Sequence, residues 1–202
     1  MSLEGVDLIE RENLMIPGEF SEKLFSMIIS NTKRMKMMIN DLLEYSHINE
    51  KSTGFEPVPL NDICSHALEM LDDEVQKNEA VFNIPELPVV FGVKIQLVRL
   101  FQNLFSNAVK YRSEAAPVVT VSWEKTGNFF TIRVKDNGIG FEQAFERKIF
   151  GFMERLHAPD SIAGTGIGLS ACKRIVEKHG GQIGVESAPG KEAHFILQSR
   201  ND

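Results

Sequence analysis

The chain has 202 residues, of which 43% are hydrophobic and 25% charged, and its formal net charge is −6. This length holds one full domain and a small additional segment, and the acidic balance argues against binding to nucleic acid. Cys64 and Cys172 are too few and too far apart for a disulfide framework or a zinc site, and the apolar runs are too short for a membrane span, so we expect a cytoplasmic segment without membrane insertion.

The first 48 residues predict helices. Residues 3–11 indicate a short helix, which Pro17 and Gly18 end. Residues 20–48 contain no Pro or Gly, and they carry a seam spaced alternately by four and three residues: Leu24, Ile28, Asn31, Met35, Met38, Leu42 and Tyr45. An amphipathic helix lying on its own domain is one interpretation. The long, narrow stripe favours a coiled coil or a helical bundle, and therefore a homodimer formed through this helix.

Residues 49–59 are rich in Ser, Thr, Gly and Pro and predict a linker, and residues 60–202 predict a globular domain. Helices are expected over 60–77, 94–111, part of 142–155 and 166–179, and strands over 81–84, 118–124, 129–135, 182–187 and 193–198. Helices and antiparallel hairpins alternate without a regular βαβ repeat. The predicted fold is therefore an α/β two-layer sandwich with a mixed sheet, preceded by a partial α-helical hairpin for dimerisation and phosphotransfer at residues 1–48.

Two asparagines lie on the same face of the helix predicted over 94–111. Asn103 and Asn107 are four residues apart, and Lys110 follows near the same face. Asn supplies an oxygen that suits a hard cation, and Lys supplies a charge that suits a phosphate. An isolated Asn pair of this kind more often marks a solvent-exposed face. The opposite face is apolar, so this helix is expected to pack on the sheet and present the three polar residues outward.

Two glycine-rich turns follow along the chain. Asp136 ends a predicted strand before Asn137-Gly138-Ile139-Gly140, where a carboxylate can accept a hydrogen bond from an adenine amine, although a plain turn explains the pattern equally well. Gly164, Gly166 and Gly168 open a predicted helix, whose backbone N–H groups and dipole favour anions. Each motif is weak evidence alone. Together with the Asn pair they indicate a nucleotide site.

Other nucleotide and catalytic motifs are absent from the sequence. It contains no Gly-x-x-x-x-Gly-Lys-Ser/Thr motif, and Gly164 to Leu169 does not meet the Rossmann fingerprint. The five histidines show no metal-ligand spacing, and no Gly-x-Ser-x-Gly occurs.

From residue 20 to residue 197 the chain resembles the catalytic core of a two-component sensor histidine kinase with a GHKL-type (Bergerat) ATP-binding domain. Four segments are similar to the N, G1, F and G2 boxes of that family: residues 103–111, 136–140, 149–157 and 164–169. The segments Lys110-Tyr111-Arg112-Ser113 and Arg155-Leu156-His157 resemble the branch that includes phytochrome-type kinases.

The resemblance implies ATP and Mg²⁺ as cofactors. Carried over by position, Asn107 would ligate Mg²⁺ through its side-chain oxygen, with Asn103 in support. Lys110 would contact phosphate, and Tyr111 would lie near the adenine.

The remaining boxes imply the rest of the ATP-binding site. Asp136 would accept a hydrogen bond from the adenine amine, and Gly138 and Gly140 would shape the base pocket. The turn that closes over the phosphates would comprise Gly164, Thr165, Gly166, Gly168 and Leu169, with Arg155 supporting it or contacting the phosphates.

Three departures from the family pattern stand out. Met153 occupies the place of a second Phe in the F box, so lid packing is expected to differ there. Glu192, Ala193 and His194 follow Lys191 where the family has Gly-Thr. The family's phosphoacceptor His would lie upstream of residue 20, but no His precedes His47. Either the chain begins after that His or the natural protein lacks it, and the start Met-Ser-Leu favours truncation.

The function that the resemblance implies is transfer of the ATP γ-phosphoryl group to a His of a dimerisation helix, and then to an Asp of a response-regulator receiver domain. This chain would bind ATP without phosphorylating itself. A phosphotransfer or scaffold protein with a vestigial nucleotide fold is one alternative, and intact nucleotide motifs argue against it. A chaperone, topoisomerase or mismatch-repair ATPase is another, but those enzymes place a Glu general base where this chain has Asn103.

Overall fold

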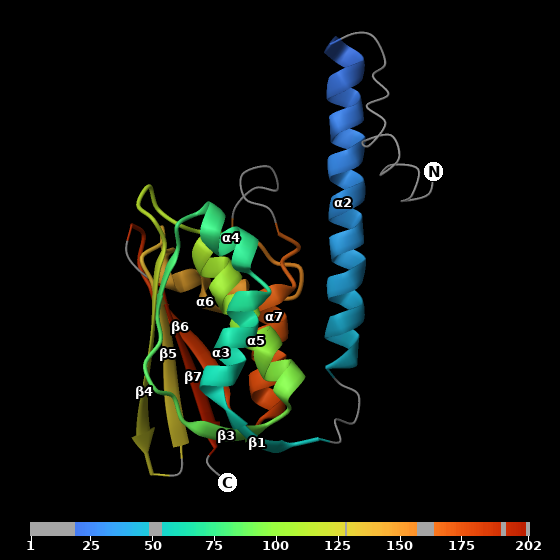
Figure 1. Ribbon diagram of the computed structural model, residues 1–202. Coiled ribbons are helices and arrows are strands. Elements are labelled where there is room, and N and C mark those ends of the chain that lie inside the picture. The colour runs from blue at the N-terminus through green and yellow to red at the C-terminus, as the bar shows by residue number, and fades with distance from the viewer. Residues whose placement is uncertain (1–18, 49–53, 128, 157–163, 191–192, 201–202) are drawn as a thin grey trace. The chain divides into compact units, whose positions relative to one another are not determined.

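The computed structural model describes residues 19–48, 54–127, 129–156, 164–190 and 193–200 (Figure 1). The chain divides into two compact units, with the boundary between Glu44 and Tyr45. In the described ranges no helix is both long enough and apolar enough to cross a membrane.

The described part of the first unit is most of helix α2 (Glu19–His47), which confirms the helix predicted over residues 20–48. The helix predicted over residues 3–11 lies outside the described residues. Several large apolar side chains of α2 are exposed, both on the predicted seam and beside it: Met27, Ile28, Met35, Met37, Ile39, Leu42 and Leu43. The apolar surface of α2 is therefore broader than the narrow stripe that the sequence predicts.

The second unit is built on a mixed five-stranded sheet with the strand order β2-β4-β5-β7-β6. Strand β2 (Val81–Asn83) runs parallel to β4 (Val118–Thr126), whereas β5 (Phe129–Asp136), β7 (Ala193–Arg200) and β6 (Gln182–Ser187) pair antiparallel. A separate two-stranded sheet joins β1 (Glu56–Pro59) to β3 (Val89–Gly92).

Helices cover one face of the large sheet (Figure 1). They are α3 (Leu60–Glu69), α4 (Asp72–Lys77), α5 (Lys94–Lys110), α6 (Glu146–Ile149) and α7 (Gly168–Lys178), with a short 3₁₀ turn at Gln143–Phe145 before α6. Alternate residues of β4, β5 and β7 point into the core between the layers, among them Val121, Ile132 and Leu197. The predicted two-layer α/β sandwich with a mixed sheet is confirmed.

Local differences from the predicted elements have physical causes. Residues 56–59 were expected in the linker, but they form β1 because they pair with β3, a strand that the sequence did not indicate. The helix expected over 60–77 breaks into α3 and α4 at Met70 and Leu71, where Leu71 turns its side chain into the core. Within 142–155, only residues 143–149 are helical.

Candidate functional site

Helix α5 carries the asparagine pair. The face of α5 opposite the pair is buried in the core: Leu97, Leu100, Phe101, Leu104, Phe105 and Ala108. Asn103 and Asn107 are half-buried one turn apart, and Lys110 is exposed at the end of the helix. The packing of the apolar face thus directs the three polar side chains away from the core, as the sequence predicts.

The turn after β5 packs against the end of α5. Asp136 is buried, with 8% of its surface exposed, and its Oδ1 accepts a hydrogen bond from the Gly138 N–H at 2.8 Å. The Ile139 N–H donates to the carbonyl oxygen of Tyr111 at 2.9 Å, so the turn is fastened to the last residue of the predicted N box. A Cβ at Gly138 would lie 2.5 Å from that carbonyl oxygen, so only glycine allows this approach.

Asn137 is a supporting residue, although the sequence around it predicts only a turn. Its Oδ1 accepts a hydrogen bond from the Val118 N–H at 2.8 Å, and its Nδ2 donates to the Ala116 carbonyl at 2.9 Å. These bonds join the turn to the start of β4. Gly140 follows with φ at 57°, a left-handed conformation that favours glycine.

The third motif is the start of α7, which lies against α5. A Cβ at Gly168 would lie 3.0 Å from the Asn103 Oδ1, so the first residue of α7 packs directly on Asn103. Before it, Thr165 is buried and its Oγ1 accepts a hydrogen bond from the Ile167 N–H at 3.4 Å. Leu169 packs against the core. The backbone N–H groups of this turn therefore begin a helix beside the Asn side chains.

The F-box segment supports the same turn. The Arg155 Nη1 donates to the Gly164 carbonyl oxygen at 2.9 Å, and a Cβ at Gly166 would lie 2.8 Å from the Glu154 carbonyl oxygen. Met153, which replaces the family's Phe, is 48% exposed and has φ at 59°. In this structure Arg155 therefore contacts the backbone of the glycine turn. His157, the last residue of the predicted F box, lies outside the described residues.

The arrangement brings the predicted motifs to neighbouring ends of three elements: the last turns of α5, the turn after β5 and the start of α7. Amide oxygens suit a hard cation, a helix N-terminus suits phosphate, and a buried carboxylate can accept a hydrogen bond from an amine. Among the described residues, no three His, Cys, Asp or Glu side chains are grouped to hold a metal ion.

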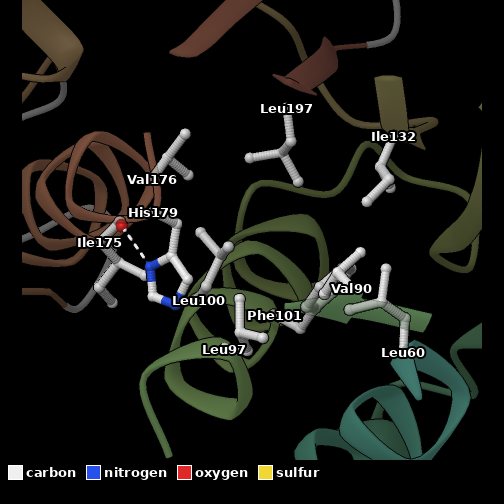
Figure 2. Close-up of a pocket in the computed structure, with 10 residues that line it drawn as sticks. All are labelled: Leu60, Val90, Leu97, Leu100, Phe101, Ile132, Ile175, Val176, His179 and Leu197. Carbon is white, nitrogen blue, oxygen red and sulfur yellow. Dashed lines mark hydrogen bonds between the residues drawn. The ribbon is translucent and has the colours of Figure 1, made fainter. Parts of the chain in front are cut away.

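A small apolar cavity of about 30 Å³ lies elsewhere, between α5, α7 and the sheet. Figure 2 shows its lining, which includes Leu97, Ile175 and His179. None of the predicted site residues lines this cavity.

Solved structures with a similar fold include histidine kinases. The chain is similar to full-length ShkA in complex with AMPPNP, with a TM-score of 0.70, 20% identity, and coverage of 93% of this chain and 40% of that chain. It is equally similar to the histidine kinase ThkA in complex with the response regulator protein TrrA, with a TM-score of 0.70, 21% identity, and coverage of 98% and 56%. The fold is that of histidine kinase catalytic domains.

Residues 92–201, more than half of the chain, match the family described as histidine kinase-, DNA gyrase B- and HSP90-like ATPase. The chain belongs to this family, and the resemblance seen in the sequence is confirmed.

Two curated relatives match most of this chain. The chain is 35% identical over 177 residues to cyanobacterial phytochrome A of Nostoc sp., covering 88% of this chain and 23% of the relative. It is 31% identical over 198 residues to the adaptive-response sensory kinase SasA of Thermosynechococcus vestitus, covering 95% of this chain and 52% of the relative. The chain therefore spans between about a quarter and half of the length of these relatives.

Proposed function

We propose that this chain is the ATP-binding catalytic part of a sensor histidine kinase and that it binds Mg·ATP. The observation that carries the proposal is the junction of the three motifs. Gly168 packs on Asn103, and Gly138 packs on the backbone of Tyr111, so both glycine motifs contact the segment that carries the asparagine pair.

The polar side chains at the end of α5 suit both Mg²⁺ and the phosphates of ATP. Asn107, supported by Asn103, presents an amide oxygen for Mg²⁺, a cation that prefers oxygen ligands and usually keeps phosphate oxygens in its shell. Lys110 is exposed and extends from the same helix end, where its charge would attract phosphate. When bound, Mg²⁺ would neutralise charge on the phosphates.

The base and the phosphates would be held by backbone and buried groups. Asp136 would accept a hydrogen bond from the adenine amine, and Gly138 and Gly140 would allow the backbone to approach the ring beside Tyr111. The N–H groups of the turn at residues 164–169 would face the phosphates at the start of α7, with Thr165 and Arg155 fixing the shape of the turn.

The reaction proposed for the whole kinase is phosphoryl transfer. A His imidazole nitrogen would attack the γ-phosphorus, the bond to the bridging oxygen of ADP would break, and ADP would leave. The phosphoryl group would then pass to an Asp of a response-regulator receiver domain. No His precedes His47 in this sequence, so we expect this chain to bind nucleotide without phosphorylating itself.

Helix α2 supports the proposal of a homodimer. Ile28, Met35 and Leu42 lie on the predicted seam and are exposed, and other apolar side chains flank them. A broad apolar surface suits a bundle of several helices better than a two-stranded coiled coil. We place the kinase domain in the cytoplasm, where ATP and response regulators are available.

Substitution of Asn107 by alanine tests the proposed site. We expect the affinity for Mg·ATP to fall on the order of 100-fold, because the cation loses its amide ligand. The circular dichroism spectrum should not change, since the Asn107 side chain is only half-buried. Gln102→Ala on the same helix is the matched control and should bind as the wild type does. Equal nucleotide affinity in both variants would contradict the assignment.

A further inference from the structure

A single imidazole joins the C-terminal end of α7 to the N-terminal end of α5. The backbone N–H of Val93, the residue before α5, lies 3.0 Å from the Nε2 of His179. A backbone N–H can only donate, so Nε2 carries the lone pair and the proton resides on Nδ1. Nδ1 accordingly donates to the Ile175 carbonyl oxygen at 2.7 Å (Figure 2).

Residues from several segments pack closely against the imidazole ring of His179. A Cβ at Gly92 would lie 2.8 Å from the Cδ2 of His179, so only glycine fits in β3 beside it. The ring centroids of Phe55 and His179 lie 5.0 Å apart, and the imidazole also lines the small apolar cavity. Burial is the main cause that lowers the pKa of His179, which keeps the ring in the neutral form that Nε2 needs to accept a hydrogen bond.

The same two helices meet a second time at the proposed nucleotide site. There Gly168, the first residue of α7, packs on Asn103 in the second half of α5. Helix α7 has 11 residues and is therefore about 16 Å long, so the imidazole lies at the end of α7 that is remote from the site. Because packed helices are nearly incompressible, fixing their remote ends limits the relative positions that their near ends can take.

We propose that His179 is a positioning residue of the nucleotide site: by bridging Val93 and Ile175 it fixes α5 against α7 and so sets the asparagine pair against the glycine turn. This inference rests on the proposed function, because it assigns His179 a role in binding at that site. It predicts that loss of the bridge weakens nucleotide binding without any loss of contact to the nucleotide.

Two amide variants separate the two hydrogen bonds. In His179→Asn the amide nitrogen replaces Nδ1 toward Ile175, and the Val93 N–H loses its acceptor. In His179→Gln the amide oxygen reaches approximately the place of Nε2 and keeps that acceptor. We expect the Asn variant to bind a non-hydrolysable ATP analogue with Mg²⁺ about tenfold more weakly, the scale expected for loss of one buried hydrogen bond, and the Gln variant to bind nearly as the wild type.

Val90→Ala is the control for general destabilisation, because Val90 lines the same cavity and is buried in β3. It should lower the melting temperature and leave the calorimetric affinity unchanged. Affinity that is unchanged in His179→Asn, or that falls equally in Val90→Ala, would show that His179 is merely structural and would overturn the inference. Failure of the wild type itself to bind the analogue would instead overturn the proposed function.

A measurement on the wild type keeps the inference testable if His179→Asn does not fold. Coupling between two sites is reciprocal, so nucleotide binding must strengthen the Val93 hydrogen bond if that bond strengthens nucleotide binding. By this reciprocity, Mg²⁺ with the ATP analogue should slow local hydrogen exchange of the Val93 amide by about the same tenfold factor that His179→Asn loses in affinity. An unchanged exchange rate at Val93 in the saturated complex would overturn the inference.

Discussion

Helix α2 and the α/β unit differ in where their apolar side chains lie. The α/β unit holds a contiguous core of buried apolar residues, in which Phe105 is 0% exposed, although Ile95 and Met70 on its surface are 78% and 62% exposed. On α2, Met27, Met35, Ile39 and Leu43 are each more than half exposed. The α/β unit therefore encloses a core of its own, whereas α2 carries several large apolar side chains on its surface.

The functional residues follow the same division. Every residue proposed for the nucleotide site belongs to the α/β unit, and the bonds that place these residues, such as Arg155 to Gly164, are internal to it. Nucleotide binding should therefore depend on the core of this unit, and α2 should act through assembly.

The largest effect on folding is expected from Phe105→Ala. Phe105 packs its ring against Phe82 and Phe101 at centroid separations of 5.0 Å and 5.7 Å, and its removal leaves a cavity in the centre of the unit. We expect the free energy of unfolding to fall by about 3–5 kcal/mol, measured by urea denaturation. A loss below about 1 kcal/mol would contradict the description of this core.

Acidification should have a smaller effect, through His179. Its folded pKa is lowered, chiefly by burial and also by the charge of Lys178, while the hydrogen bond to Ile175 opposes the shift. As the pH falls below about 6.5, the unfolded chain binds a proton that the folded chain does not, so stability declines until the lower folded pKa is passed.

Titration of His179 alone changes the free energy of unfolding by at most about 1.4 kcal/mol per pH unit. Urea denaturation between pH 7.5 and 5 measures this decline. The unfolding free energy of the wild type should fall more steeply with acidification than that of His179→Gln, whose side chain does not titrate. Parallel pH profiles for the two proteins would contradict the assigned titration.

The smallest effect on the α/β unit is expected from Leu42→Ser on α2. Leu42 is 46% exposed, so the unfolding free energy of the α/β unit should change by less than about 0.5 kcal/mol. Self-association should weaken, as sedimentation equilibrium would show. A fall in the stability of the α/β unit comparable to that of Phe105→Ala would remove the distinction between the two regions.

Much of the fold could be predicted from the sequence because its signals are local. The apolar period of α5, the Gly127 turn between β4 and β5, and the glycines before α7 each determine the structure of their own segment. Strand β3 could not be predicted, because it is four residues long and exists through pairing with β1, at least 30 positions earlier. The break between α3 and α4 contains no Gly or Pro and depends on burial of Leu71.

The candidate site likewise has a part that the sequence predicts and a part that it does not. The residue types and their order along the chain indicated which motifs belong together. The contacts that hold them do not follow from spacing: Arg155 to Gly164 depends on the path of the backbone, and His179 to Val93 joins residues 86 positions apart. Asn137 gave only a turn signal, although its amide fixes the start of β4.

The most direct test of the nucleotide site is calorimetric titration of the wild-type chain with a non-hydrolysable ATP analogue, with Mg²⁺ and with Mg²⁺ removed by a chelator. We predict binding of one analogue per chain that is tighter with Mg²⁺, because the amide oxygen of Asn107 and the phosphates share the cation. No binding, or the same affinity with and without Mg²⁺, would contradict the proposed site.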